Sequence, residues 1–376
     1  MHIVYNLFEA VNYGGIERIV LGKINWLVNH GHEVTIVTTD RKGRMPFYHI
    51  DERVNMIDLN VNYSDDWQDS QLMKQLKRAV KLRHHRKALT EVLERIKPDI
   101  TVSTFGSEVE FLHSIKAGGK KVVEIHFSRN FRRLESSSIS KRIVNFIHTF
   151  KDKYDVRHYD AFVCLTEEDL PAWGKQNNIL AIPNFVNELY PHRASLESNH
   201  AIAVGRLSYE KGFDRLIDIW KMVTERHPDW ILDIYGDGEL RSELEHQITR
   251  LGLEGKVILH HVANPIEERI VESSMLLMTS HYEGLPMVML EAMSCGVPVV
   301  CYDFKCGPRD VITTECGVVV KEGESRAFAD SVCRLIEDKQ LRKSLGEGSY
   351  ERAKIYLKEE VMNKWINLFE GLTASS

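Results

Sequence analysis

The chain has 376 residues, which is too long for one ordinary hydrophobic core and suits two domains of about 150–200 residues each. Hydrophobic residues make up 43% and charged residues 27%, as is normal for a globular protein. The net charge of −5 gives no overall basis for nucleic-acid binding, and no window reaches the roughly 18 uncharged apolar residues of a membrane span.

In the first half, short β-branched runs alternate with helical segments. The run HIVYNLF, at residues 2–8, is followed by a helical pattern that Gly31 interrupts. Later strand-like runs are EVTIVTT, DITVSTF, KVVEIHF and AFVCLT. This alternation predicts a parallel sheet with helices on both faces.

The second half repeats the pattern without repeating the sequence. Strand-like AIAVGRL and WILDIYG are each followed by a helical segment, and KVILHH, MLLMTS and PVVCYD continue the series. Between the halves, Pro183 forces extended geometry on Ile182, which predicts a linker. The whole pattern predicts an α/β protein with two Rossmann-like domains, whose parallel sheets face each other across a cleft.

We place the N-terminal domain at residues 1–184 and the C-terminal domain at residues 185–358. Residues 359–376 are expected to form a helix that packs back on the N-terminal domain. Ligands of such sheets bind beyond the carboxyl ends of the strands, so the loops at those ends are the candidate sites.

Two common sequence patterns are missing from the chain. The start, MHIVYNLFEA, lacks the basic residues and long apolar stretch of a signal peptide, so we expect the protein in the cytoplasm. Four of the six cysteines lie between positions 295 and 316, but none has C-x2-C spacing. We therefore expect free thiols rather than a zinc site.

Paired glycines follow the first predicted strand. Gly14 and Gly15 precede a helix, where backbone amides can approach an anion and the helix terminus adds about half a positive charge. The alternative is a tight turn without a ligand, because the G-x-G-x-x-G pattern and the Walker lysine are both missing.

Two cations lie on the loop after the strand AIAVGRL. Arg206 follows Gly205 directly, and Lys211 lies five positions later, before the next helix. A planar guanidinium and a compact ammonium group together suit a diphosphate. The alternative is a pair of solvated surface cations.

The segment SHYEGLPMVMLEA, at residues 280–292, combines two glutamates with a helix start. Pro286 suits the first turn of a helix, which places Glu283 before the helix and Glu291 in its second turn. Amides near Leu285 and Met287 can hold an anion, while carboxylates accept hydrogen bonds from sugar hydroxyls. The alternative is a capping Glu283 and an exposed Glu291, although an acid buried in the apolar run VMLEAM requires a partner.

His126 ends the strand-like run VVEIHF. Near the end of a strand, a histidine can donate hydrogen bonds or move a proton. The chain has 17 histidines, so a structural role is the alternative.

Several ordered segments resemble glycosyltransferase family 4, whose members have the GT-B fold. They are VGRLSYEKGFDRLI, YGDGELRSELE and HYEGLPMVMLEAMSCGVPVV. Glu283 and Glu291, with seven residues between them, match the spacing of the family's two glutamates. The resemblance extends from the turn at Gly14 to the C-terminal helical region.

The resemblance implies retaining, metal-independent transfer from a nucleotide-sugar, usually a UDP- or GDP-sugar. It makes residues 1–184 the acceptor-side domain and residues 185–358 the nucleotide-sugar-binding domain. It places Arg206 and Lys211 on the diphosphate and Glu291 on the ribose hydroxyls. It places Glu283 at the donor-sugar hydroxyls and His126 in the reaction site. The other implied donor-binding residues are Gly14, Gly15, Gly205, Gly284, Leu285, Pro286 and Met287.

The implied roles agree with the chemistry of the bond that breaks. Negative charge grows on the diphosphate in the transition state, and fixed cations and amides stabilise that change. The pair Asp65-Asp66 lies in a polar stretch, and we assign it no metal role. We expect no metal and no cofactor, since the nucleotide-sugar is a substrate.

Two segments depart from the usual family pattern. The stretch 305–312 contains Gly307-Pro308 in place of the common Gly-Gly, as in bacterial polysaccharide-assembly transferases. Phe127 and Ser128 follow His126, which is also a departure.

The predicted activity is hexosyl transfer. A hexose or N-acetylhexosamine would pass from a UDP-sugar to a saccharide or lipid-linked saccharide, in cell-surface polysaccharide synthesis. The alternatives are another GT-B enzyme, such as a nucleotide-sugar epimerase or phosphorylase, and a non-enzymatic nucleotide-sugar-binding protein. A phosphorylase would require a lysine for pyridoxal phosphate, and the sequence shows no setting for one.

Residues 74–87, KQLKRAVKLRHHRK, contain seven Lys or Arg, two His and no acid. Leu76, Val80 and Leu89 keep an approximately helical apolar spacing. The segment is either a solvated helix face or a contact with an anionic membrane surface, where each cation contributes about 1 kcal/mol. A second basic patch comprises Arg129, Arg132, Arg133, Lys141 and Arg142.

Overall fold

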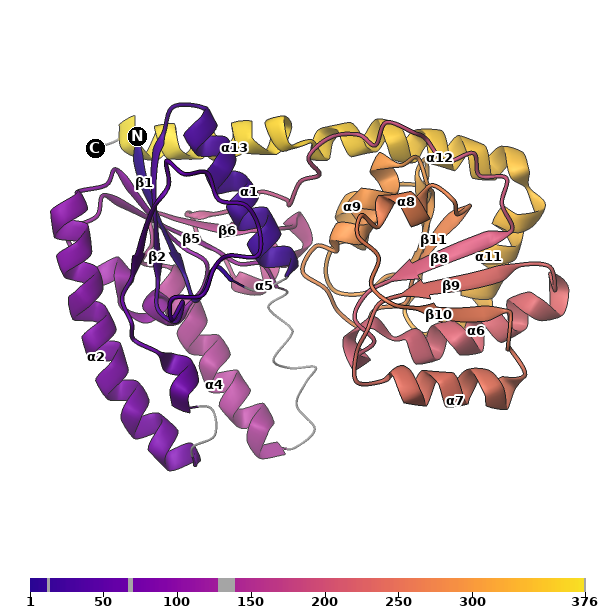
Figure 1. Ribbon diagram of the computed structural model, residues 1–376, viewed down its shortest axis with the longest axis horizontal. Helices are drawn as coiled ribbons and strands as arrows, with labels where there is room; N and C mark the ends of the chain where they lie inside the picture. Colours follow the sequence, from indigo (N-terminus) through magenta and orange to yellow (C-terminus); the bar gives the residue numbers. More distant parts are fainter. Residues whose placement is uncertain (12–13, 67–69, 128–138, 375–376) are drawn as a thin grey trace. The chain divides into compact units, whose positions relative to one another are not determined.

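The computed structural model describes residues 1–376 except 12–13, 67–69, 128–138 and 375–376, and also omits the side chains of 71–72 and 139–144. The chain forms two compact units (Figure 1). Unit 1 comprises Met1–Ile182 with Met362–Ser376, and unit 2 comprises Pro183–Val361. These limits lie a few residues from 184 and 358, the boundaries expected from the sequence.

Unit 1 contains a parallel sheet with the strand order β3-β2-β1-β4-β5-β6-β7. The strands are β1 (His2–Leu7), β2 (Glu33–Thr38), β3 (Asn55–Asp58), β4 (Ile100–Ser103), β5 (Lys120–Glu124), β6 (Ala161–Cys164) and β7 (Ile179–Ala181). The central strands are buried along almost their whole length, because helices cover both faces of the sheet.

The helices of unit 1 divide between the two faces of this sheet. They are α1 (Gly15–Asn29), α2 (Gln71–Ile96), α4 (Ile139–Val156), α5 (Leu170–Trp173) and α13 (Lys358–Ala374), with short 3-10 turns η1 (Tyr63–Asp66), η2 (Ser107–Glu110), η3 (Leu112–Ser114) and η4 (Glu167–Asp169). Leu89 and Leu93 of α2 join a core with Phe111, Phe162 and Trp173.

The segment expected to pack back on unit 1 belongs to α13. Trp365 and Phe369 of this helix are buried, and the Lys23 ammonium of α1 lies 4.2 Å from the centre of the Trp365 ring.

Unit 2 contains a second parallel sheet, with the strand order β10-β9-β8-β11-β12-β13. The strands are β8 (His200–Val204), β9 (Ile231–Tyr235), β10 (Val257–His260), β11 (Met275–Met278), β12 (Val299–Tyr302) and β13 (Gly317–Val320). The helices and turns are η5 (Tyr209–Lys211), α6 (Phe213–Arg226), α7 (Arg241–Leu251), α8 (Glu267–Ile270), α9 (Met287–Ser294), α10 (Pro308–Val311), α11 (Ser325–Glu337), α12 (Lys339–Ala353) and η6 (Lys354–Tyr356).

Both sheets have the doubly wound order 3-2-1-4-5-6, which unit 1 extends by one strand. The chain reverses its direction of winding between β1 and β4 in unit 1, and between β8 and β11 in unit 2. Ligands of such sheets bind at this switch point, beyond the carboxyl ends of the strands. The prediction of two Rossmann-like, parallel-sheet domains is confirmed.

The structure also contains elements that the sequence pattern does not predict. Strands β3 and β7 have only four and three residues, too few to show an alternating pattern.

Strand β5 ends at Glu124, so His126 lies beyond the strand rather than at its last position.

The apolar residues along α2 differ widely in burial. Leu89 is fully buried, but Leu76 is 59% and Val80 65% exposed. No helix in the described part of the chain is long and apolar enough to cross a bilayer.

Candidate functional site

In unit 2, the loops that follow β8 and β11 lie at the switch point of the sheet. The first loop leads through Gly205 and Arg206 into η5, which contains Lys211. The second leads through Ser280 and Glu283 into α9. Most of the predicted donor-binding residues therefore lie on two neighbouring loops at the edge where this fold binds ligands.

An ion pair joins the two loops. The Lys211 Nζ atom donates to Glu283 Oε1 at 2.6 Å, and the Ser280 hydroxyl donates to the same oxygen at 2.8 Å. Both charged side chains are mostly buried. Since no hydrogen bond from a described residue reaches Glu283 Oε2, that atom can accept a hydrogen bond from a ligand.

Two glycines allow the loops to come together. A Cβ atom at Gly205 would lie 3.0 Å from the Lys211 side chain, which passes directly over this glycine. Gly212 has a φ of +62°, and a Cβ there would collide with the carbonyl oxygen of Thr279. A side chain at either position would displace Lys211 or separate the loops.

Backbone contacts hold the Glu283 loop in place. The Glu283 amide donates to the Lys305 carbonyl at 2.9 Å, and the His281 amide donates to the Glu210 carbonyl at 2.8 Å. The rings of Tyr209 and His281 stack with their centres 4.4 Å apart. The position of Glu283 is therefore determined by contacts on both sides of the loop.

Arg206 lies on the same loop as Lys211 but in a different environment. Its side chain is exposed, and it forms no ion pair with a described residue. The guanidinium group is thus accessible to an anionic ligand, whereas the Lys211 ammonium is held by Glu283.

The turn before α9 exposes the first amides of that helix. Pro286 is the N-cap residue and α9 begins at Met287, one position later than expected. The Asn184 side-chain amide donates to the Leu285 carbonyl at 3.4 Å. Glu291 is only 5% exposed, which excludes the alternative of an exposed surface acid.

Gly307 packs against the same turn. A Cβ atom at this position would lie 3.4 Å from Pro286 and 3.7 Å from the carbonyl oxygen of Gly284. The Gly-Pro segment that departs from the family pattern thus contacts the turn predicted to bind the distal phosphate.

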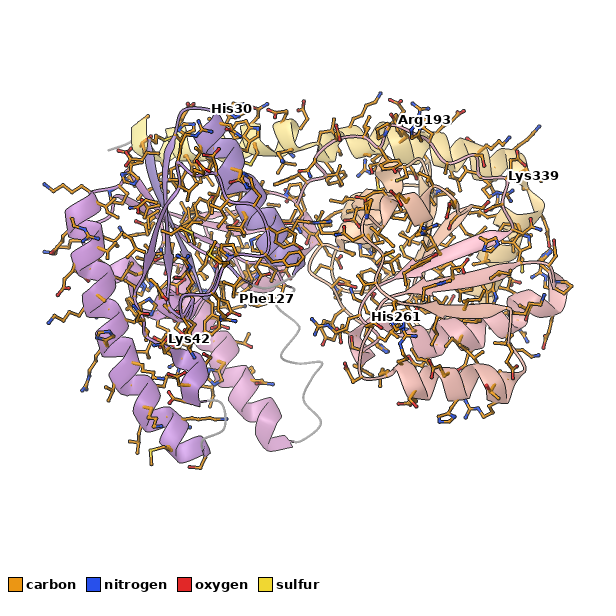
Figure 2. The ribbon with its side chains drawn as sticks, in the orientation of Figure 1. His30, Lys42, Phe127, Arg193, His261 and Lys339 are labelled. Carbon is orange, nitrogen blue, oxygen red and sulfur yellow. The ribbon has the colours of Figure 1, made fainter. Side chains whose placement is uncertain are left out.

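In unit 1, His126 is nearly buried beside an ion pair. Its Nε2 atom lies 3.4 Å from Glu124 Oε2, and neither ring nitrogen forms a hydrogen bond with a described residue. Glu124 also pairs with Lys23 inside the protein. Burial raises the pKa of Glu124, but Lys23 and His126 together lower it to about 2. Phe127 (labelled in Figure 2) packs edge-on against Phe105, with ring centres 5.6 Å apart.

The N-terminus of α1 is already close to a carboxylate. Gly14 is the N-cap residue and Gly15 the first helical residue. A Cβ at Gly14 would collide with the carboxylate of Glu17, whose pKa is raised chiefly by burial. Phosphate binding by Gly14 and Gly15 stays a prediction, and Glu17 is a neighbour that the sequence pattern did not indicate.

The acidic pair Asp65-Asp66 contacts lysines. Asp65 pairs with Lys42 (labelled in Figure 2), and Asp66 pairs with Lys77 and Lys81. These carboxylates are thus neutralised by cations of the protein itself.

The six cysteines are free and buried.

The predicted residues fall into two groups. Gly14, Gly15 and His126 belong to unit 1, and the remaining predicted site residues belong to unit 2. Sequence reasoning missed the role of Ser280 as a partner of Glu283 and missed the Lys23–Glu124 pair. The only sequence signal for the Lys23–Glu124 pair would have been an acid and a lysine that each lie within an apolar segment.

Comparisons with known proteins agree with the fold. Residues 190–352 match the family described as glycosyl transferases group 1. The amylovoran biosynthesis glycosyltransferase AmsD of Erwinia amylovora is 27% identical over 376 residues, covering 94% of this chain and 95% of that relative.

Two solved structures are similar over nearly the whole chain. Sucrose-phosphate synthase from Thermosynechococcus elongatus has a TM-score of 0.79 at 16% identity, with 100% of both chains covered. A mutant of S. aureus TarM, in complex with fondaparinux, alpha-GlcNAc-glycerol and UDP, has a TM-score of 0.75 at 17% identity, covering 98% of this chain and 99% of TarM. Residues 190–352 thus match the model of the glycosyl transferases group 1 family, and the chain as a whole has the GT-B fold of these solved structures.

Proposed function

We propose that this protein is a retaining, metal-independent glycosyltransferase of family 4. It moves a hexose or N-acetylhexosamine from a nucleotide-sugar, preferentially a UDP-sugar, to a saccharide or lipid-linked saccharide acceptor. The observation behind this proposal is the Lys211–Glu283 ion pair at the switch point of unit 2, beside the accessible Arg206. The resemblance to AmsD supports a place in polysaccharide synthesis, and the UDP in the TarM complex supports the choice of nucleotide.

The two cations suit the leaving group of this reaction. When the bond between the sugar and the diphosphate breaks, negative charge grows on the phosphate oxygens. Arg206 and Lys211 come from one short loop and can contact the same diphosphate. A fixed ammonium in a mostly buried setting stabilises the transition state more than the ground state, which is what accelerates the reaction.

Glu283 is placed to orient the donor sugar. Its Oε1 atom is held by Lys211 and Ser280, which leaves Oε2 for a sugar hydroxyl. Glu291 lies in the second turn of α9, and we assign it to the ribose hydroxyls. Gly284 and the amides before α9 would then contact the distal phosphate.

Unit 1 supplies the acceptor side in this proposal. We assign His126 to the reaction site on the strength of the family resemblance, although both of its ring nitrogens are buried and lack hydrogen-bond partners among the described residues. Of the two glycines at the start of α1, Gly15 is open to a ligand, whereas the Glu17 carboxylate lies against Gly14. We also propose that the protein works in the cytoplasm, at the membrane face where lipid-linked acceptors are present.

Donor turnover tests the proposal directly. The purified chain is incubated with UDP-glucose, UDP-galactose, UDP-N-acetylglucosamine and GDP-mannose, with and without EDTA, and nucleotide release is measured. We expect slow release from at least one UDP-sugar and no effect of EDTA. Binding without any release would identify a non-enzymatic binder, and conversion of one intact UDP-sugar into another would identify an epimerase.

The stereochemistry requires a second measurement. Once a donor and an acceptor are known, NMR of the product reports the anomeric configuration. Retention of the α-configuration of the donor supports the assignment to family 4, whereas inversion contradicts it.

A further inference from the structure

Two neighbouring helices of unit 1 expose seven large apolar side chains. These side chains are between 46% and 65% exposed. They are Met73, Leu76 and Val80 of α2, and Phe146, Ile147, Phe150 and Tyr154 of α4. Exposed apolar residues that gather in one place, unlike scattered ones, mark a binding surface.

On α2, the exposed apolar residues form one stripe. Met73, Leu76 and Val80 have the spacing i, i+3, i+7, and the same stripe continues with Arg83 and Lys87. Figure 1 shows the reason for the exposure, since the end of α2 that begins at Gln71 extends beyond the strands. The helix is therefore apolar at its projecting end and cationic behind it.

On α4, the exposed apolar residues also share one face, but cations precede them in the sequence as well as follow them. Phe146, Phe150 and Tyr154 lie one turn apart on one face, and the first two rings are 5.2 Å apart. Lys151 and Lys153 follow the two phenylalanines along the helix. The end of α4 that begins at Ile139 extends beyond the sheet in the same direction as α2 (Figure 1).

One carboxylate connects the two helices. Glu110 of η2 pairs with Arg78 of α2 and with Lys151 of α4. These ion pairs show that the two helices are neighbours, and each apolar stripe faces away from the buried residues of its own helix, such as Leu89 and Leu93 on α2 and Val156 on α4. We name the seven apolar residues with Arg83, Arg86 and Lys87 the α2–α4 surface.

The charge of this surface restricts what can cover it. Residues 74–87 contain seven Lys or Arg and no acid. Within the described part of the chain, Lys74, Arg83 and Arg86 have no carboxylate partner, and Lys87 has only a distant one at 3.9 Å. Two copies of such a surface would repel each other, whereas an anionic surface would be attracted.

We propose that the α2–α4 surface docks on a bilayer that contains anionic lipids. The projecting apolar side chains enter the interface between headgroups and acyl chains, and the cations behind them contact lipid phosphates. Aromatic side chains such as Phe146, Phe150 and Tyr154 are well suited to this interfacial zone. This proposal does not depend on the transfer reaction, because none of these residues belongs to the site in unit 2.

Vesicle co-sedimentation of the full chain tests the proposal. Vesicles of phosphatidylglycerol and phosphatidylethanolamine are compared with vesicles of phosphatidylcholine, at low and high salt. We expect binding to the anionic vesicles, weaker binding to the neutral ones, and a decrease with salt. Since one cation near an anionic surface contributes about 1 kcal/mol, R83Q and R86Q should each weaken binding about fivefold.

The apolar part of the surface has a matched control. The double variant F146S/F150S removes two exposed rings and should abolish sedimentation with anionic vesicles. F47S removes a phenylalanine of similar exposure from another part of unit 1 and should leave binding unchanged. Circular dichroism confirms that each variant is folded, and release of UDP from a soluble donor should be the same in all of them.

Two results would overturn the proposal. The first is equal sedimentation of the wild type and F146S/F150S, or no sedimentation of either. The second is a dimer in size-exclusion chromatography without lipid that F146S/F150S converts to a monomer, which would assign the surface to a second copy of the chain. Loss of UDP release in every protein, with vesicle binding intact, would contradict only the proposed function.

Discussion

The Lys211 ammonium and the Glu283 carboxylate lie 2.6 Å apart, although 72 positions separate them in the sequence. Each comes from a loop that follows a central strand of unit 2, and the Ser280 hydroxyl completes the group. The pair joins a cation suited to a diphosphate to an acid suited to a sugar. Five predictions test how the site and the fold around it work.

Replacing Lys211 by alanine should reduce kcat by about 100-fold or more, because one preorganised charge contributes a few kcal/mol to the transition state. The measurement is UDP release or product formation at saturating donor. K321A is the control, since it removes an exposed lysine that forms an ion pair in the same unit. Similar rates for K211A and the wild type would contradict the assigned role.

The substitution E283Q preserves the shape of the side chain but removes its negative charge. We expect kcat/KM to fall by about 100-fold, since the donor sugar loses an ionic hydrogen-bond acceptor and Lys211 loses its partner. Because the pair is mostly buried, circular dichroism must confirm that the variant is folded before its kinetics are compared. E347Q, on an exposed face of α12, is the control and should have normal kinetics. Full activity of E283Q would remove Glu283 from the mechanism.

Glu291 should affect donor binding more than the chemical step. If it binds the ribose, its contacts are equal in the ground state and the transition state, and E291Q should raise KM about 10-fold while kcat changes much less. Steady-state kinetics with a varied UDP-sugar measure both constants. A large fall in kcat with an unchanged KM would instead place Glu291 at the reacting bond.

Gly212 and Gly252 form a matched pair for the geometry of the loop. Both have a left-handed backbone, with φ of +62° and +65°, but only at Gly212 would a Cβ collide with a neighbouring carbonyl. G252A should cost about 1–2 kcal/mol of unfolding free energy, from backbone strain alone. G212A should cost clearly more and should also reduce activity, because Thr279 and the Glu283 loop must move. Equal losses in urea denaturation would show that the collision is relieved without cost.

The Lys23–Glu124 pair makes a pH-dependent contribution to stability. Because the pKa of Glu124 is lowered from 4.5 to about 2, the pair stabilises the folded state fully above pH 4.5. This contribution decreases as the pH falls from 4.5 through about 2. The unfolding free energy of the wild type should therefore fall more steeply over this range than that of E124Q.

The same pair has an internal control at neutral pH. E124Q leaves Lys23 buried without its charged partner and should cost about 3–5 kcal/mol. The double variant K23M/E124Q removes the buried charge and should recover much of that loss. If the double variant is less stable than E124Q, then the ammonium is held by other groups, such as the ring of Trp365.

The parts of the fold that depend on local sequence could be predicted well. Strand β1 and helices α6 and α9 have apolar patterns that match their burial, and Pro286 marks the start of α9 within one residue. The linker near Pro183 is likewise a local consequence of proline geometry. The short edge strands β3 and β7 could not be predicted, because their pairing depends on a neighbouring strand rather than on their own pattern.

The sequence by itself determined the alternation of strands and helices, the loops that can bind a donor, and the residue types on those loops. Only the tertiary structure decided which of these residues meet. The Lys211–Glu283–Ser280 contact requires the order β9-β8-β11, which brings two loops from distant parts of the chain to one edge of the sheet. Burial was also decided at this level, since Leu76 and Leu89 lie on one regular helix, yet only Leu89 reaches the core. The two leucines lie 13 positions apart and therefore point in directions about 140° apart around the helix. The spacing specifies which residues share a face, but only the packing of the helix on the sheet decides which face is covered.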